Sequence, residues 1–136
     1  MSVVKSKRGE STAEFVNTAR ELNIYSIQRC VSFPKRYTFY IGQEISNHAN
    51  NIYSNVLTAN AIHPSNKHEA QMRRDHILTA YAECEILISK IGLAHDMFGI
   101  SDSSMKEWMK LLSNEQRLLN GVKKHDKEKY KDLPDI

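Results

Sequence analysis

Apolar residues recur along this chain at intervals of three and four positions, which is the spacing of one face of an α-helix. Only three prolines and five glycines occur among 136 residues, and they fall mostly between the periodic segments. There is almost no strand signal. The pattern therefore predicts an all-α protein with four helices.

The first predicted helix starts at Ser11 and ends near Phe33-Pro34. Ser11 and Glu14 have capping-box spacing, in which the Ser side chain accepts from the third helical N–H and the Glu returns to the Ser N–H. The second helix starts near Pro34, whose missing N–H suits a first turn, and ends at His63-Pro64. The two apolar faces comprise Phe15, Ala19, Leu22, Ser26 and Cys30, then Tyr37, Ile41, Ile45, Ala49, Ile52, Val56 and Ala59.

The third predicted helix opens at Asn66, which forms a second candidate capping box with Glu69, and stops at Gly99. The run Ser101–Ser104 supplies N-cap candidates for the fourth helix, whose last turn Gly121 weakens. Their apolar faces comprise Ala70, Ile77, Tyr81, Cys84, Ile88, Ile91 and Phe98, then Met105, Trp108, Met109, Leu112, Leu119 and Val122.

Short connections between these segments predict antiparallel neighbours and an up-down-up-down four-helix bundle. A chain of 136 residues suits one domain with one core. We expect a basic N-terminal arm at 1–10, the bundle at 11–124 and a charged C-terminal tail at 125–136, a helical extension that frays.

Further apolar residues of the second and third helices lie away from these main faces. They are interpreted either as scattered surface hydrophobics or as an interface with a neighbouring subunit, and the alignment within each helix favours self-association. The residues predicted to form this oligomer interface are Phe39, Tyr53, Leu57, Met72, Ile86, Leu93 and Met97.

The formal net charge of +3 is unevenly distributed. Residues 1–9, 34–36 and 123–131 together carry +8, whereas the rest of the chain carries −5. Such basic clusters are typical of nucleic-acid binding, although a solvated, solubilising surface is the alternative. The candidate phosphate-binding residues within them are Lys5, Lys7, Arg8, Lys35, Arg36, Lys123, Lys124 and Lys127.

No catalytic or cofactor motif is recognisable. The chain has neither a dinucleotide-binding nor a P-loop glycine pattern, and its six histidines do not form a His-Glu-x-x-His pair. Cys30 and Cys84 have the setting of buried thiols, because each lies among apolar residues with helical spacing. We therefore expect no enzymatic activity, no cofactor and no metal. The basic N-terminus lacks the apolar run of a signal peptide, so we expect a cytoplasmic protein.

Three segments resemble a known group of proteins. They are the opening Met1–Ser11, the junction Phe33-Pro34-Lys35-Arg36-Tyr37 and Met72-Arg73-Arg74-Asp75. Together they resemble the four-helix-bundle family that includes the accessory variability determinant of diversity-generating retroelements and the proteins encoded by intervening sequences of bacterial rRNA genes. The resemblance covers nearly the whole chain.

The resemblance implies a non-enzymatic accessory protein that assembles into a barrel-like homopentamer and binds a reverse transcriptase and its template RNA during mutagenic cDNA synthesis. It implies that Lys35 and Arg36 match a basic junction of the family, and that Arg73 and Arg74 match its basic pair in the third helix. The alternative is a helical oligomeric scaffold that binds only protein. Nucleic-acid affinity should fall with salt, whereas docking through apolar helix faces should change little.

Overall fold

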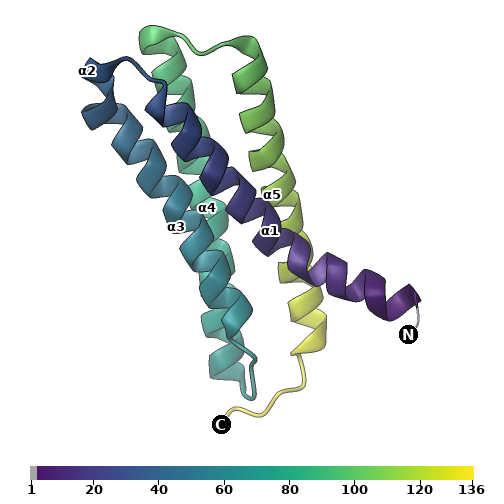
Figure 1. Cartoon of the computed structure of the whole chain (residues 1–136). Helices are drawn as coiled ribbons and strands as arrows, with labels where there is room; N and C mark the ends of the chain where they lie inside the picture. Colours follow the sequence, from purple (N-terminus) through teal and green to yellow (C-terminus); the bar gives the residue numbers. More distant parts are fainter. Residues whose placement is uncertain (1–2) are drawn as a thin grey trace.

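The computed structural model describes the backbone of residues 3–136 and the side chains of residues 14–136. This part of the chain forms four long helices and no strand, which confirms the predicted all-helical fold. The long helices are α1 (Val3–Val31), α3 (Gln43–Ala61), α4 (Lys67–Phe98) and α5 (Asp102–Lys129). They run up-down-up-down, as Figure 1 shows.

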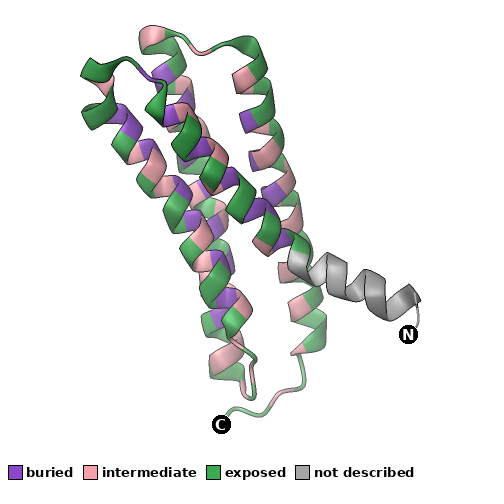
Figure 2. Ribbon diagram, in the orientation of Figure 1, coloured by how far each residue is buried: buried purple, intermediate pink, exposed green. Residues whose placement is uncertain are grey.

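The helices surround one core. α3 packs against α1 and α4, and α5 packs against the same two helices, so α3 and α5 occupy diagonal corners. Figure 2 shows the buried positions facing inward along all four helices. Trp108 is fully buried, and its indole N–H donates to the buried Ser26 hydroxyl at 2.9 Å, which satisfies the polar atom that a tryptophan brings into a core.

The predicted start of the first helix is wrong. α1 begins at Val3, so the helix continues through Ser11 instead of starting there. The capping-box pattern at Ser11 and Glu14 is a local signal, and Ser and Thr are also tolerated inside helices. The side chains of the predicted basic arm at residues 1–10, including Lys5, Lys7 and Arg8, lie outside the described residues.

The second predicted helix is continuous but not uniform. Pro34 precedes the short helix α2 (Lys35–Tyr37), and the π-helical segment η1 (Thr38–Gly42) leads directly into α3. The helix ends at Ala61, just before His63-Pro64, as predicted. Periodicity alone did not reveal the π-helical turn, because one wide turn changes the spacing at a single point only.

The caps of the last two helices confirm the sequence signals. The Asn66 side chain accepts from the Glu69 N–H at 2.8 Å, while the Glu69 carboxylate accepts from Ser65 and not from Asn66 itself. Gly99 ends α4 with a φ of 81°, a left-handed conformation that glycine adopts without steric cost. Ser101 caps α5 by accepting from the Ser104 N–H.

The C-terminal segment is more ordered than a fraying tail. α5 extends through Gly121 to Lys129, and the chain then returns to the start of α4. There the Lys67 N–H donates to the Pro134 carbonyl at 2.8 Å. The tail therefore provides an acceptor for one of the N–H groups that every helix start leaves free.

The predicted buried faces of α1 and α3 are confirmed, but that of α4 is only partly correct. Ala70, Tyr81 and Ile88 are half-buried, and the fully buried positions include three residues outside the prediction. Those residues are Ala80, Leu87 and Ala94. α4 contacts both α3 and α5, so its buried face is wider than the predicted row of apolar residues and is shifted around the helix relative to that row. None of the helices in the described part of the chain combines the length and the apolar character needed to cross a membrane.

Candidate nucleic-acid interface

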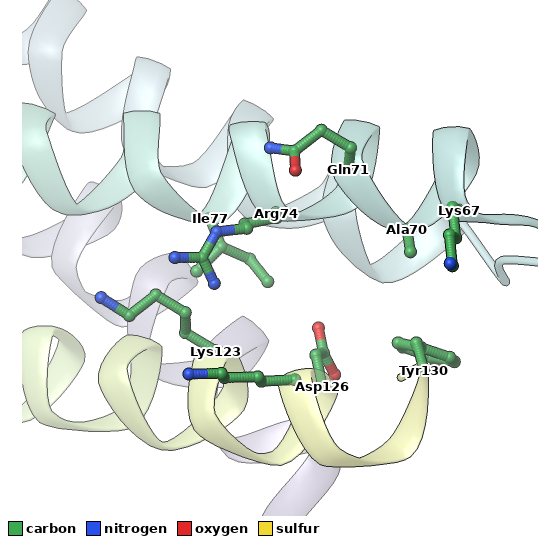
Figure 3. A pocket seen from close by; sticks show the side chains of 9 residues that line it. Lys67, Ala70, Gln71, Arg74, Ile77, Lys123, Asp126 and Tyr130 are labelled. Carbon is green, nitrogen blue, oxygen red and sulfur yellow. The ribbon is translucent and has the colours of Figure 1, made fainter. Parts of the chain in front are cut away.

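A cleft lies between the first half of α4 and the last turns of α5. Its volume is about 290 Å³. Figure 3 shows Arg74 from α4 and Lys123 from α5 extending into the space between the two helices. The lining residues are Lys67, Ala70, Gln71, Arg74, Ile77, Lys123, Asp126, Lys127 and Tyr130. We call this the α4/α5 cleft.

The α4/α5 cleft is strongly basic. Four of its lining residues are cations, namely Lys67, Arg74, Lys123 and Lys127, and one is an acid, Asp126. The Asp126 carboxylate is paired with Arg73 at 2.6 Å, so it does not offset the four cations. Clustered cations with low-dielectric walls concentrate positive potential, which favours a polyanion.

Lys67 has a partner in the tail. Its ammonium lies 3.3 Å from the Asp135 carboxylate, but the two side chains are 59% and 85% exposed. An ion pair this exposed contributes little to stability and is screened by salt. Lys67 therefore remains available to a phosphate that enters the cleft.

Arg73, for which the resemblance implies nucleic-acid binding, does not line the α4/α5 cleft. It is buried, and its Nε donates to Asp126 at 2.6 Å. A second nitrogen, Nη1, donates to the carbonyls of Ala59 at 2.8 Å and Ile62 at 3.3 Å. Because the last carbonyls of a helix lack intrahelical partners, this side chain closes the end of α3 and joins it to α5.

Arg74, the neighbour of Arg73, points into the cleft. Adjacent residues on a helix are rotated by about 100°, so one arginine of the pair faces the core and the other the cleft. The sequence did not distinguish the two, because both belong to the same basic pair.

The other predicted cations are not gathered at this site. Lys124 is exposed on α5 but does not line the cleft. Lys35 and Arg36 are exposed at the opposite end of the bundle, where Tyr37 stacks on Phe98 with ring centroids 5.0 Å apart. Phe98 lies about 36 Å along α4 from Arg74, at 1.5 Å per residue. The structure therefore separates the predicted cations into two regions.

Four cleft residues were missed by the sequence analysis: Lys67, Gln71, Asp126 and Tyr130. Lys67 precedes Arg74 by seven residues, which is about two helical turns, so helical spacing could have placed them on one face. Tyr130 could not have been found in that way, because only the antiparallel packing of α5 on α4 brings it to the cleft.

The residues predicted to form an oligomer interface lie mostly on the outside. Leu93 and Met97 are each 48% exposed and follow Ile86 along the outer face of α4. Phe39, Leu57 and Met72 are also exposed. Tyr53 is an exception, since its half-buried ring packs against the core. α1 adds a further exposed row that the sequence analysis did not include, consisting of Ile24, Ile27 and Val31.

Cys30 and Cys84 are free and buried, as predicted. Burial raises the pKa of both thiols. The negative charge that Glu115 gains at alkaline pH and the carboxylates of Glu85 and Glu83 raise the pKa of Cys84 further. A thiol with a raised pKa carries little thiolate at neutral pH, so neither cysteine has the environment of a nucleophile.

Glu115 is the main feature of the core that the sequence analysis missed. Its side chain is fully buried in α5, and neither carboxyl oxygen has a hydrogen-bond partner among the described residues. Burial raises the pKa of Glu115 to about 9, so the carboxyl group is neutral at physiological pH. Residues 14–136 contain no cluster of three or more His, Cys, Asp or Glu side chains arranged to hold a metal ion.

Comparison with known proteins adds no relative on which a function could be based. No protein-family model, curated protein or solved structure matches this chain. Function is therefore inferred from the residues of this chain and from the resemblance of its three segments.

Proposed function

We propose that this protein is a non-enzymatic, cytoplasmic accessory subunit of a diversity-generating retroelement. In this role it binds template RNA and the reverse transcriptase and supports mutagenic cDNA synthesis, which is the chemistry of the polymerase. It acts as a homopentamer. The observation that carries the proposal is the α4/α5 cleft, where four cations from two helices converge and the acid among them is already paired.

The form of the cleft supports a polyanionic ligand. Lysine and arginine side chains bind phosphate oxygens without reading sequence, and affinity rises with the number of phosphates contacted. The cations project from two helices that pack together, so the backbone positions that carry them are set before any ligand arrives. Preorganised cations lose less conformational entropy on binding than cations on a mobile arm.

The resemblance supports the choice of RNA and of a retroelement. It rests on the opening Met1–Ser11, the junction at 33–37 and the segment at 72–75, and Arg74 of the last segment lines the cleft. The burial of Arg73 leaves Arg74 as the phosphate-binding member of that pair.

Reversing two charges in the cleft tests this proposal. Lys123→Glu combined with Lys127→Glu should weaken binding of a mixed-sequence single-stranded RNA in filter-binding measurements. It should also reduce the slope of log K against log salt by about 1.4, at roughly 0.7 for each phosphate that is no longer bound. Circular dichroism should stay helical, because Lys123 is only half-buried and Lys127 is exposed.

A matched control is available on the same helix. Lys106 and Lys110 are exposed, have the same four-residue spacing and do not line the cleft. Lys106→Glu combined with Lys110→Glu makes the same change in net charge. If the two double variants lose RNA affinity equally, the cleft is not the binding site and only the overall charge matters.

The second candidate function is a scaffold that binds only protein. The exposed apolar row of α4, formed by Ile86, Leu93 and Met97, favours it. Apolar rows of this kind mark interfaces with other chains. The salt series separates the two functions, because docking through these residues would change little with salt whereas phosphate contacts weaken steadily. A wild-type protein that binds no RNA at low salt would favour the scaffold.

A further inference from the structure

Two consecutive aromatic side chains stand exposed where the second helix begins. Phe39 and Tyr40 are each 73% exposed, and their rings lie perpendicular with centroids 5.4 Å apart. Aromatic rings that are this exposed add little to the stability of the fold, because they bury little apolar surface in the core. Their position therefore calls for an explanation other than folding.

The π-helical turn η1 produces this arrangement. It keeps Ile41 and Gly42 buried against the end of α1, where a Cβ on Gly42 would lie 3.5 Å from Phe33. The preceding two positions, Phe39 and Tyr40, both remain outside. Single π-helical turns inside α-helices occur frequently at functional sites.

The outer face of α3 continues from this pair as a row of neutral amides. Gln43, Asn47 and Asn50 are exposed, and their side chains have no hydrogen-bond partner among the described residues. Asparagine is a weak helix former, so exposed asparagines without intramolecular contacts cost helix stability. The charged residue of α3, Glu44, is directed to Lys90 of α4 at 2.7 Å and leaves the outer face uncharged.

Two cations lie one turn before the aromatic pair. Lys35 and Arg36 are exposed and form no ion pair with the described residues. The Arg36 guanidinium lies 5.1 Å from the ring centroid of Tyr37, which itself stacks on Phe98. This contact restricts the Arg36 side chain and holds its charge over Tyr37, one turn before the aromatic pair.

We propose that η1 and the outer face of α3 bind the bases of a single-stranded nucleic acid, an inference that rests on the proposed function. Phe39 and Tyr40 stack on bases, and the amides of Gln43, Asn47 and Asn50 hydrogen-bond to base edges. Lys35 and Arg36 contact the flanking phosphates. We call this the η1/α3 face.

The chemistry of the face favours a single strand over a duplex or a protein. Aromatic rings stack on bases of any identity, but only unpaired bases expose their faces. Asn and Gln match the donor and acceptor pattern of base edges. A protein docked on the two rings would also cover the adjacent amides, and amides buried without partners cost free energy.

An abasic strand separates contacts to bases from contacts to phosphates. Wild-type protein should bind a mixed-sequence single-stranded RNA on the order of tenfold more tightly than an abasic strand of equal length. The binding free energy of one stacked base corresponds to about this ratio of affinities. Phe39→Ala combined with Tyr40→Ala should remove this preference and leave affinity for the abasic strand unchanged. The slope of log K against log salt should stay the same, because the same number of phosphates remains bound.

A matched control removes exposed apolar side chains elsewhere. Ile24→Ala combined with Ile27→Ala truncates two exposed residues of α1 that lie outside the predicted oligomer interface and should keep the preference for intact RNA. A second variant, Asn47→Ala with Asn50→Ala, should narrow the differences in affinity among homopolymeric strands. Alanine is the better helix former, so this variant cannot lose binding through unfolding of α3.

Three results would overturn the inference. If the aromatic variant keeps the preference for intact RNA while the cleft variant loses binding, the η1/α3 face is not a base-binding surface and the proposed function stands. If the aromatic variant instead lowers the oligomer mass by light scattering and keeps that preference, the two rings form a subunit contact. If wild-type protein binds neither strand, the inference and the proposed function both fail.

Discussion

The α4/α5 cleft and the η1/α3 face expose opposite kinds of chemistry on one bundle. The cleft has four cations and a single tyrosine, whereas the face has two aromatic rings, three amides and cations only at its start. Cations bind phosphates of any sequence, and aromatic rings and amides contact bases. The proposed roles of the two regions therefore place affinity and ligand preference on different helices.

The two regions are also separated in space. α3 and α5 occupy diagonal corners, and η1 lies at the end of the bundle opposite the cleft. A single strand that contacted both regions would follow the surface of α4 or α1 between them. Substitutions in one region should therefore leave the other unchanged, since distant sites without shared partners act additively.

The largest expected effect concerns the buried arginine beneath the cleft. Arg73→Ala removes the arginine donor from the Asp126 carboxylate and from the Ile62 carbonyl, while the Ala59 carbonyl keeps only the Ile62 N–H. Removing one partner of a buried ion pair costs about 3–5 kcal/mol of unfolding free energy. Urea denaturation monitored by circular dichroism measures this loss.

The neighbouring arginine is the control for that experiment. Arg74→Ala should change stability by less than about 0.5 kcal/mol and weaken RNA binding, because Arg74 faces the cleft and not the core. An Arg73→Ala variant that is as stable as wild type but binds RNA poorly would show that Arg73 is a ligand residue, which would extend the cleft into the core.

A further effect is the dependence of stability on pH that the buried Glu115 introduces. The pKa of Glu115 is raised by burial from its ordinary value of 4.5 to about 9, so between these pH values the folded state keeps a proton that the unfolded state releases. The free energy of unfolding should therefore fall as pH rises through this window, by at most about 1.4 kcal/mol per pH unit. Below the window both states carry the proton, and this contribution is constant.

Glu115→Gln tests the predicted fall of the free energy of unfolding with pH, because glutamine has nearly the same shape as glutamic acid. The glutamine does not titrate, so its unfolding free energy at pH 6 and pH 9 should differ less than that of wild type in urea denaturation. Equal pH dependence in the two proteins would mean that Glu115 is not a neutral core residue.

A smaller effect is expected from the two cations at the start of the η1/α3 face. Lys35→Glu combined with Arg36→Glu should reduce the salt slope for single-stranded RNA by about 1.4 while the preference for intact over abasic RNA remains. Helicity should be kept, because acids near a helix N-terminus stabilise it by about 0.3–1 kcal/mol each. Filter binding over a salt series measures both quantities.

The same double variant tests whether phosphate contacts and base contacts are separated between the two regions. If it abolishes the preference for bases, the cations position the strand on the aromatic pair and the two kinds of contact are coupled. If it changes neither slope nor affinity, phosphate binding belongs to the α4/α5 cleft alone.

The helices and most of their buried faces follow from local sequence patterns. Phe15, Ala19 and Leu22 of α1 are fully buried, as their spacing predicts. The caps at Asn66, Ser101 and Gly99 likewise follow from local chemistry. These features are readable because they depend on residues three or four positions apart, a distance set by the helix itself.

The packing of the helices establishes which polar residues are buried and which cations lie together. Arg73 and Asp126 are 53 residues apart in sequence, and no local pattern distinguishes Arg73 from the exposed Arg74. Glu115 occupies a core position that a charged residue type would not suggest. Lys67, Arg74 and Lys123 line one cleft because α5 packs antiparallel on α4. Burial and convergence depend on how helices pack, whereas local periodicity specifies only the side from which each helix can pack.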